Sequence, residues 1–279
     1  MINSFMERIS AISVIEKRFI KINSSLDLVL ANYAIEDIHH FRIEIKKLKA
    51  FLHLLKLGSN NAPAFKLPPG IKRFYKVIGN VRSLQLQQDR FKEMAGGADA
   101  YLPSKYVGEL NKKEKANIVK AKNLIRSKEP FIKEKDHLIS GLKEKNENIK
   151  EKEFLKSAIA SLNQHLSSGN PSDKTLHSIR KILKDILYTQ PFIKIKIKSV
   201  PLSMLPDHSN LKLLSTLLGD FQDIYTGLKL LHAHGADNLP EPERIFLMNV
   251  EKEWKEEKEE IRKKVMDQLK ATGLIPIIS

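Results

Sequence analysis

Residues 39–51 read HHFRIEIKKLKAF, and residues 177–188 read HSIRKILKDILY. Both stretches contain the pattern H-x-x-R-x-x-x-K, and their apolar residues recur at spacings of three and four. That spacing is typical of an amphipathic α-helix, in which positions three, four and seven apart share a face. The two stretches therefore predict two similar helices that carry the same polar face.

A second pair of similar segments follows the first pair. Residues 77–84 read VIGNVRSL, and residues 217–224 read LLGDFQDI. Both landmarks recur about 140 residues further along the chain and in the same order, which is the signature of an internal repeat. We therefore predict a duplicated helical unit, with a first repeat at residues 1–144 and a second at residues 145–279.

Helical periodicity extends over most of the chain. Of its 279 residues 42% are hydrophobic, and only 12 are glycine and 12 proline, which favours an all-α fold with a sizeable core. We expect Pro130 to break or kink one long helix, and Ser172 or Asp173 to cap the helix of His177. The predicted helices are 3–30, 36–57, 71–94, 104–144, 146–167, 173–190, 209–234 and 241–270.

One segment departs from helical periodicity. Residues 192–198, FIKIKIK, alternate apolar residues with lysine, and this period of two is typical of a strand. No second strand is visible to pair with it, and unpaired strand edges are costly. We therefore expect an extended connector that lays its isoleucines on the helices.

The charge of the chain is strongly basic, and each motif helix carries a cationic stripe. The 48 Lys and Arg residues against 33 Asp and Glu give a formal charge of +15. A row of like charges repels itself, so its presence in both halves predicts a bound anion, with a solvated basic face as the alternative. Glu44 and Asp185 are expected to lie off these stripes. The stripes are His39, Arg42, Lys46, Lys49, His53 and Lys56 in the first helix, and His177, Arg180 and Lys184 in the second.

The sequence lacks the residues that several classes of protein require. Without cysteine there is no disulfide scaffold, thiolate zinc site or cysteine nucleophile. No apolar run approaches the roughly 20 residues of a membrane-spanning helix, and the N-terminal stretch reads as a helix of the domain. We expect a cytoplasmic protein with no cofactor and no metal. The pair Glu36-x-x-His39 has the spacing of a di-iron ligand pair, but the second half offers no matching pair.

These motifs resemble the CHAD domain family, the conserved-histidine α-helical domains. The resemblance rests on H-x-x-R-x-x-x-K-K-x-K at residues 39–49, on H-x-x-R-x-x-x-K-x-x-x-Y at residues 177–188, and on Gly79 and Gly219. It covers nearly the whole chain. It implies two similar helical bundles around a pseudo-twofold axis, with a basic central channel that binds inorganic polyphosphate without catalysis. A cytoplasmic location that can include polyphosphate granules is implied as well.

The chain departs from the family pattern at several positions. Lys46, Lys47 and Lys49 stand where the family favours arginine, so charge is kept but the bidentate fork is lost. Leu187 replaces a usual basic residue, and the Arg-Asp pair after the glycine is split in both halves. The residues expected to bind polyphosphate are His39, Arg42, Lys46, Lys47, Lys49, His53, Lys56, Arg73, Lys76, Arg82, His177, Arg180, Lys181 and Lys184.

Two other functions use the same residues. A nucleic-acid-binding helical protein would need the same charge, but base stacking requires exposed aromatic side chains, and none lies on the cationic stripes. A phosphohydrolase or phosphotransferase would use His39 or His177, but the chain has no P-loop and no carboxylate cluster for Mg²⁺. The string Glu251-x-Glu253-x-Lys255 resembles a triphosphatase motif, yet it lies in a predicted helix and not in a strand.

Overall fold

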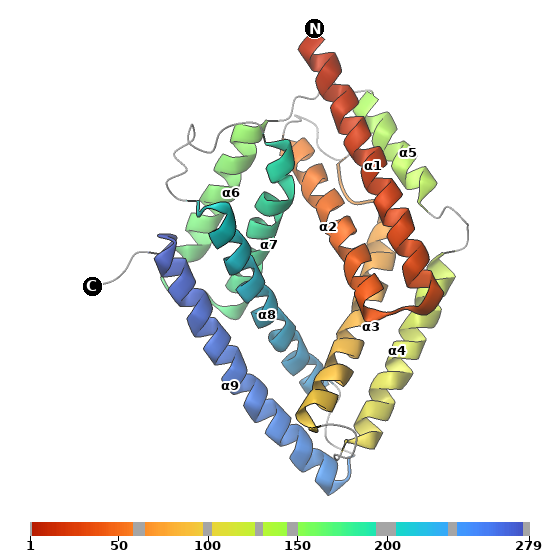
Figure 1. The fold of residues 1–279 in the computed structure, drawn as a ribbon, viewed down its shortest axis with the longest axis vertical. Coiled ribbons are helices and arrows are strands. Elements are labelled where there is room, and N and C mark those ends of the chain that lie inside the picture. The colour runs from red at the N-terminus through yellow and green to blue at the C-terminus, as the bar shows by residue number, and fades with distance from the viewer. Residues whose placement is uncertain are drawn as a thin grey trace.

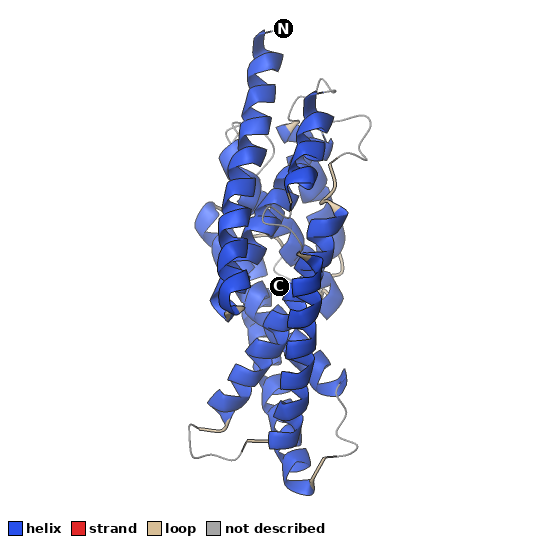
Figure 2. Ribbon diagram, turned by 90° about the vertical axis from the view of Figure 1, so that its right-hand side faces the viewer, coloured by secondary structure: helices blue, strands red, loops and turns tan. Residues whose placement is uncertain are grey.

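The computed structural model describes residues 2–57, 65–96, 102–125, 131–143, 150–193, 205–233 and 239–275. Within these ranges the regular elements are nine α-helices and one 3₁₀ turn, with no strand, as Figure 2 shows. The predicted all-α fold class is therefore confirmed for the described residues. The elements are α1 (Ile2–Asn32), α2 (Ile35–Leu57), α3 (Pro69–Met94), α4 (Ser104–Leu124), α5 (Ile132–Lys143), α6 (Glu151–Leu166), α7 (Asp173–Thr189), η1 (Gln190–Phe192), α8 (His208–Ala233) and α9 (Glu241–Ala271).

The helix ends follow local signals in the sequence. The predicted helix 104–144 is two helices, α4 and α5, and Pro130 itself lies between them, outside the described residues. Ser172 caps α7 as expected, because its hydroxyl accepts a hydrogen bond from the Thr175 backbone N–H at 3.2 Å. Of the alternating segment, Phe192 closes the 3₁₀ turn. Residues 194–198 lie outside the described residues, so the extended connector stays a prediction.

Helices α2 and α7 pack against each other at the centre of the molecule (Figure 1). Each is followed by a long helix, α3 after α2 and α8 after α7, and these two also meet. On the outside, α1 packs on α2, α6 on α7, α4 on α3 and α9 on α8. The two motif helices are therefore brought side by side by the rest of the fold.

The core uses the apolar stripes of the motif helices. Ile38, Phe41 and Ile45 of α2 and Ile179 and Leu183 of α7 are all fully buried, in a cluster that also includes α1 and α6. Burying such side chains contributes about 1.5–3 kcal/mol each. This burial fixes the rotation of both helices, so that their polar faces have to lie away from this cluster.

A second, smaller cluster lies where α3, α4, α8 and α9 come together. Its centre is Trp254 of α9, which stacks on Phe91 of α3 with ring centroids 5.5 Å apart. At its edge the buried Glu243 accepts the backbone N–H groups of Lys105 and Tyr106, at 2.9 and 3.0 Å. The carboxylate thereby caps the first turn of α4 from another helix.

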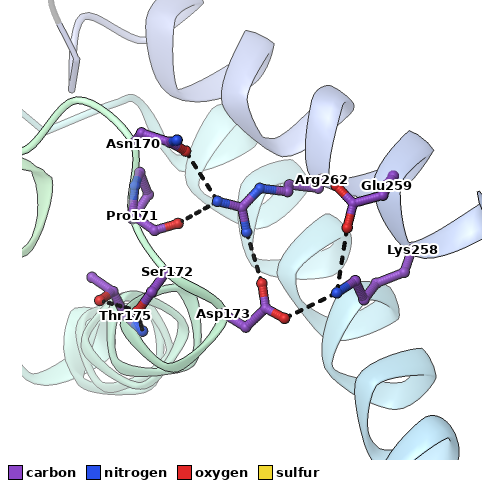
Figure 3. Close-up of polar contacts among 8 residues, drawn as sticks. All are labelled: Asn170, Pro171, Ser172, Asp173, Thr175, Lys258, Glu259 and Arg262. Carbon is purple, nitrogen blue, oxygen red and sulfur yellow. Dashed lines mark hydrogen bonds and ion pairs between the residues drawn. The ribbon is translucent and has the colours of Figure 1, made fainter. Parts of the chain in front are cut away.

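Helix α9 also anchors the first turn of α7 (Figure 3). The Asp173 carboxylate accepts hydrogen bonds from Arg262 Nη1 at 2.7 Å and from Lys258 Nζ at 3.0 Å. Arg262 Nη2 donates to the Pro171 carbonyl at 2.7 Å and to Asn170 Oδ1 at 3.0 Å. These bonds hold the end of α7 from which His177 and Arg180 project.

We predict that Asp173→Ala lowers the free energy of unfolding by about 1–3 kcal/mol, the range for hydrogen bonds to charged groups. The loss arises because Lys258 and Arg262 lose their shared partner while remaining mostly buried, with 18% and 20% of their side chains exposed. Urea denaturation measures the change. Glu259→Ala is the control, because that carboxylate also contacts Lys258 but is 62% exposed. A loss as large in Glu259→Ala would contradict the prediction.

Candidate functional site

Lys46 of α2 lies at the centre of a group of cations from three helices. Its neighbours in charge are Arg42 of α2, Arg82 of α3, and Arg180 and Lys184 of α7. Burial, followed by the repulsion of these four groups, lowers the pKa of Lys46 from 10.5 to about 7. We call these five residues the cationic cluster. The cluster joins the two predicted stripes, because α2 and α7 pack against each other.

Arg42 is held in one position by α3. Its Nη1 donates a hydrogen bond to the Tyr75 backbone carbonyl at 2.9 Å, and its guanidinium lies 4.2 Å from the centre of the Tyr75 ring. It also lies directly against Gly79, where a side chain would overlap it. Burial lowers the pKa of Arg42, and the charges of Arg82 and Arg180 lower it further.

Arg180 occupies the matching position on α7 but is held less tightly. It faces Gly219 of α8, where a methyl group would lie 3.5 Å from its Nη2, an ordinary van der Waals distance. The Nε atoms of Arg180 and of Arg82 are both buried and have no hydrogen-bond partner. Buried donors without a partner are rare in folded proteins, and both of these Nε atoms are closed to solvent.

The two motif histidines lie beside the arginines, and both have a lowered pKa. Burial, followed by the charge of Arg82, lowers the pKa of His39 below its ordinary 6.5, although Glu36 opposes the shift. Burial, followed by the charge of Lys181, lowers the pKa of His177. His177 is hydrogen-bonded to Gln222, which stands in α8 where Arg82 stands in α3. Neutral imidazoles of this kind serve as hydrogen-bond partners.

Some predicted site residues are engaged elsewhere. Lys47 donates to Glu44 at 2.7 Å, and Glu44 is also paired with Arg18 of α1. The Nδ1 of His53 lies 3.2 Å from the carboxylate of Asp185 on α7. Asp185, which we expected to lie off the stripes, thus contacts a residue of the α2 stripe. Neither Lys47 nor His53 is among the groups that act on Lys46.

No contact brings the remaining predicted residues of α2 and α3 to the cluster, and most of them are exposed among the described residues. Lys184 Nζ, within the cluster, lies 5.7 Å from the centre of the Tyr188 ring. Lys56 is half-buried near the end of α2. The exposed residues are Lys49, Arg73, Lys76 and Lys181.

Sequence reasoning missed the residues that support the cluster. Tyr75 comes four residues before Gly79, and Tyr188 four residues after Lys184, so helical spacing could have placed both on the site face. It also missed the acids of α8. The charge of Asp223 raises the pKa of Arg42 and so opposes the effect of burial there. Burial, followed by the charge of Asp223, raises the pKa of Asp220.

Metal ligands and membrane spans were also sought in the described part of the chain. There, no three His, Asp or Glu side chains gather in a way that could hold a metal ion. No helix in the same ranges is long and apolar enough to cross a membrane.

Comparison with known proteins gave one match. The family model described as CHAD domain matches residues 13–232, from within α1 to near the end of α8. No curated protein and no solved structure matched the chain.

The cationic cluster predicts how the stability of the protein depends on pH. In the folded protein Lys46 releases its proton near pH 7, whereas in the unfolded chain it does so near 10.5. Between these values the unfolded state binds more protons, so the free energy of unfolding should rise with pH. The slope should stay below the about 1.4 kcal/mol per pH unit of one full proton.

Urea denaturation of the wild type and of Lys46→Met between pH 6 and 9.5 measures this effect. The wild type should gain stability relative to the variant as the pH rises, and the variant should be the more stable protein at pH 6. Parallel pH profiles for the two proteins would show that Lys46 keeps its ordinary pKa.

Proposed function

The chain belongs to the CHAD domain family, which is associated with polyphosphate binding, and we propose that it binds inorganic polyphosphate at the cationic cluster. One observation carries the proposal. Five cations, Lys46 with Arg42, Arg82, Arg180 and Lys184, converge from three helices. The predicted role of His39, Arg42, Lys46, Arg82, Arg180 and Lys184 in binding is therefore retained as part of this proposal.

Electrostatics explains why a polyanion would occupy this site. Two like charges about 4–8 Å apart repel by about 2–4 kcal/mol at an effective dielectric constant near 20. A chain of phosphates offsets several such repulsions at once, and its oxygens accept charge-assisted hydrogen bonds from guanidinium and ammonium groups. A single small anion would neutralise fewer of these groups. The site therefore favours a polyvalent ligand.

The chemistry of the cluster favours polyphosphate over nucleic acid. The aromatic ring beside Arg42, that of Tyr75, is half-buried and already covered by the guanidinium. Tyr188 is half-buried as well. Neither offers the free face on which a base would stack. Nucleic acid thus remains the second candidate, on the strength of charge alone.

We further propose that binding occurs without hydrolysis and that the protein acts in the cytoplasm, where polyphosphate granules would be one location. The triphosphatase-like string at Glu251 supports no enzyme, because it lies within α9 and Glu251 pairs there with Lys255 and His232. Binding would then depend on contacts from the cationic cluster without a catalytic group.

The duplication into residues 1–144 and 145–279 is also a proposal. It is supported by two matching pairs of contacts. Arg42 faces Gly79, and Arg180 faces Gly219 in the same way. The charge of Arg82 acts on His39, and Gln222, at the position matching Arg82, contacts His177. The packing order also agrees with a duplication. In the first half α1 packs on α2, α2 on α3 and α3 on α4, and in the second half α6 packs on α7, α7 on α8 and α8 on α9. A polyphosphate bound at the cluster would touch both repeats.

We predict that affinity increases with the length of the phosphate chain. Each added phosphate releases further counterions and reaches further side chains, as in protein–nucleic acid binding. Titrations with long-chain polyphosphate, pyrophosphate, ATP and single-stranded RNA at matched ionic strength measure this. Long polyphosphate should bind at least roughly tenfold more tightly than RNA, which is about 1.4 kcal/mol. Equal or tighter binding of RNA would favour the nucleic-acid function.

The same samples with added Mg²⁺ or Mn²⁺ test the absence of hydrolysis. No orthophosphate should be released above background. Release that is lost in His39→Ala or His177→Ala would instead identify a phosphohydrolase.

We predict that Arg42→Ala and Arg180→Ala each weaken polyphosphate binding by about 1–3 kcal/mol, or about 5–150-fold in Kd. Neither change should destabilise the free protein by much, because each also removes a charge that repels Lys46. Lys46→Ala and Lys184→Ala should cost less, because lysine contributes a point charge without a planar fork.

Lys120→Ala on α4 and Lys133→Ala on α5 are matched controls, because both lysines are exposed and lie on outer helices. At about 0.15 M salt, where screening acts over roughly 8 Å, they should change Kd by less than about twofold. If they weaken binding as much as the arginine variants do, attraction is spread over the surface and the cluster is not the site.

A further inference from the structure

Two glycines in helix interiors need an explanation. Gly79 lies in the middle of α3 and Gly219 in the middle of α8, at matching positions of the two halves. Neither has a positive φ among the described glycines, so the backbone there suits any residue. Glycine also weakens a helix relative to alanine. The reason for a glycine must therefore lie in what packs against it.

At Gly79 the space of a side chain is taken by Arg42. A methyl group there would overlap Nη1 and would lie 2.9 Å from Cζ and 3.3 Å from Nη2 of the guanidinium. The guanidinium is also held by Tyr75. Its Nη1 donates a hydrogen bond to the Tyr75 backbone carbonyl at 2.9 Å, and its Cζ lies 4.2 Å from the centre of the Tyr75 ring. Tyr75 and Gly79 are four residues apart and so share one face of α3.

The matching contact in the second half is loose. A methyl group on Gly219 would lie 3.5 Å from Nη2 and 3.7 Å from Nε of Arg180, which is ordinary contact. Four residues before Gly219 stands Ser215, so no aromatic ring takes the place of Tyr75. The Nε of Arg180 has no hydrogen-bond partner. At this contact Arg180 is therefore packed less closely than Arg42 is.

We propose that Gly79 is a positioning residue of the binding site: its missing side chain lets α3 hold the Arg42 guanidinium ready for the phosphate chain. Gly219 does not position Arg180 in this way. This inference rests on the proposed function. A group that is already fixed loses less freedom on binding, so Arg42 contributes a preformed contact and Arg180 one that adapts.

A side chain at position 79 would act on Arg42 and not on the fold. The overlapping atoms belong to the end of a flexible side chain, which can move away while the α3 backbone stays in place. The Gly79 carbonyl already accepts a hydrogen bond from Ser83 Oγ at 3.0 Å, which alanine would preserve. Gly79→Ala should therefore yield a folded protein with a displaced Arg42.

The test is a double-mutant cycle in polyphosphate binding, with Gly79→Ala, Arg42→Ala and the two combined. Gly79→Ala should raise Kd about fivefold or more, and the double variant should bind no more weakly than Arg42→Ala alone. Gly219→Ala, the matched control, should stay within about twofold of the wild type. A wild-type Kd in Gly79→Ala, or effects of the two changes that multiply, would overturn the inference.

The same four proteins without ligand separate this inference from the proposed function. In the Arg42→Ala background the space beside Gly79 is free, so Gly79→Ala should raise Tm through better helix propensity. In the wild-type background that gain should be abolished or reversed, while Gly219→Ala should raise Tm. An equal change in Tm in both backgrounds would refute the contact even if polyphosphate binds. A wild type that does not bind polyphosphate would refute the proposed function, and the Tm cycle would still decide whether Gly79 holds Arg42.

Discussion

Cations from α2, α3 and α7 repel one another where these helices meet, and interactions elsewhere in the structure have to offset this repulsion. Both motif helices bury an apolar stripe, and their packing brings Arg42 and Lys46 toward Arg180 and Lys184. Burial, followed by this crowding of charges, lowers the pKa of Lys46 to about 7. A fold that keeps such a cluster partly buried in the absence of a ligand is stabilised elsewhere, by its apolar core and by ion pairs such as that of Asp173 with Arg262.

The two halves of the site are similar in plan but differ in their electrostatics. The first half provides Arg82, an Arg42 held by Tyr75, and His39, whereas the second has Gln222 beside His177 and the acids Asp220 and Asp223 on α8. These carboxylates oppose positive charge in both halves, because Asp223 acts on Arg42 and Arg180 acts on Asp220.

Much of the fold followed from the sequence, because the apolar spacing of each helix is a local property. Helix periodicity located α2 and α7, and Ser172 marked the start of α7. The details of the site depended on how α3 and α1 rotate against α2, which no single helix encodes. For that reason the pairing of Arg18 with Glu44 and the stacking of Arg42 on Tyr75 were not predicted.

The central claim, that polyphosphate binds at the cationic cluster, is tested most directly by the titration of Lys46 itself. Nuclear magnetic resonance of the lysine Cε and Hε groups, assigned with Lys46→Arg, would follow its pKa with and without saturating polyphosphate. The free protein should show a pKa of about 7, and bound phosphates should raise it toward the ordinary 10.5. A titration of Lys46 that is unchanged when polyphosphate is bound would place the ligand elsewhere and contradict the account.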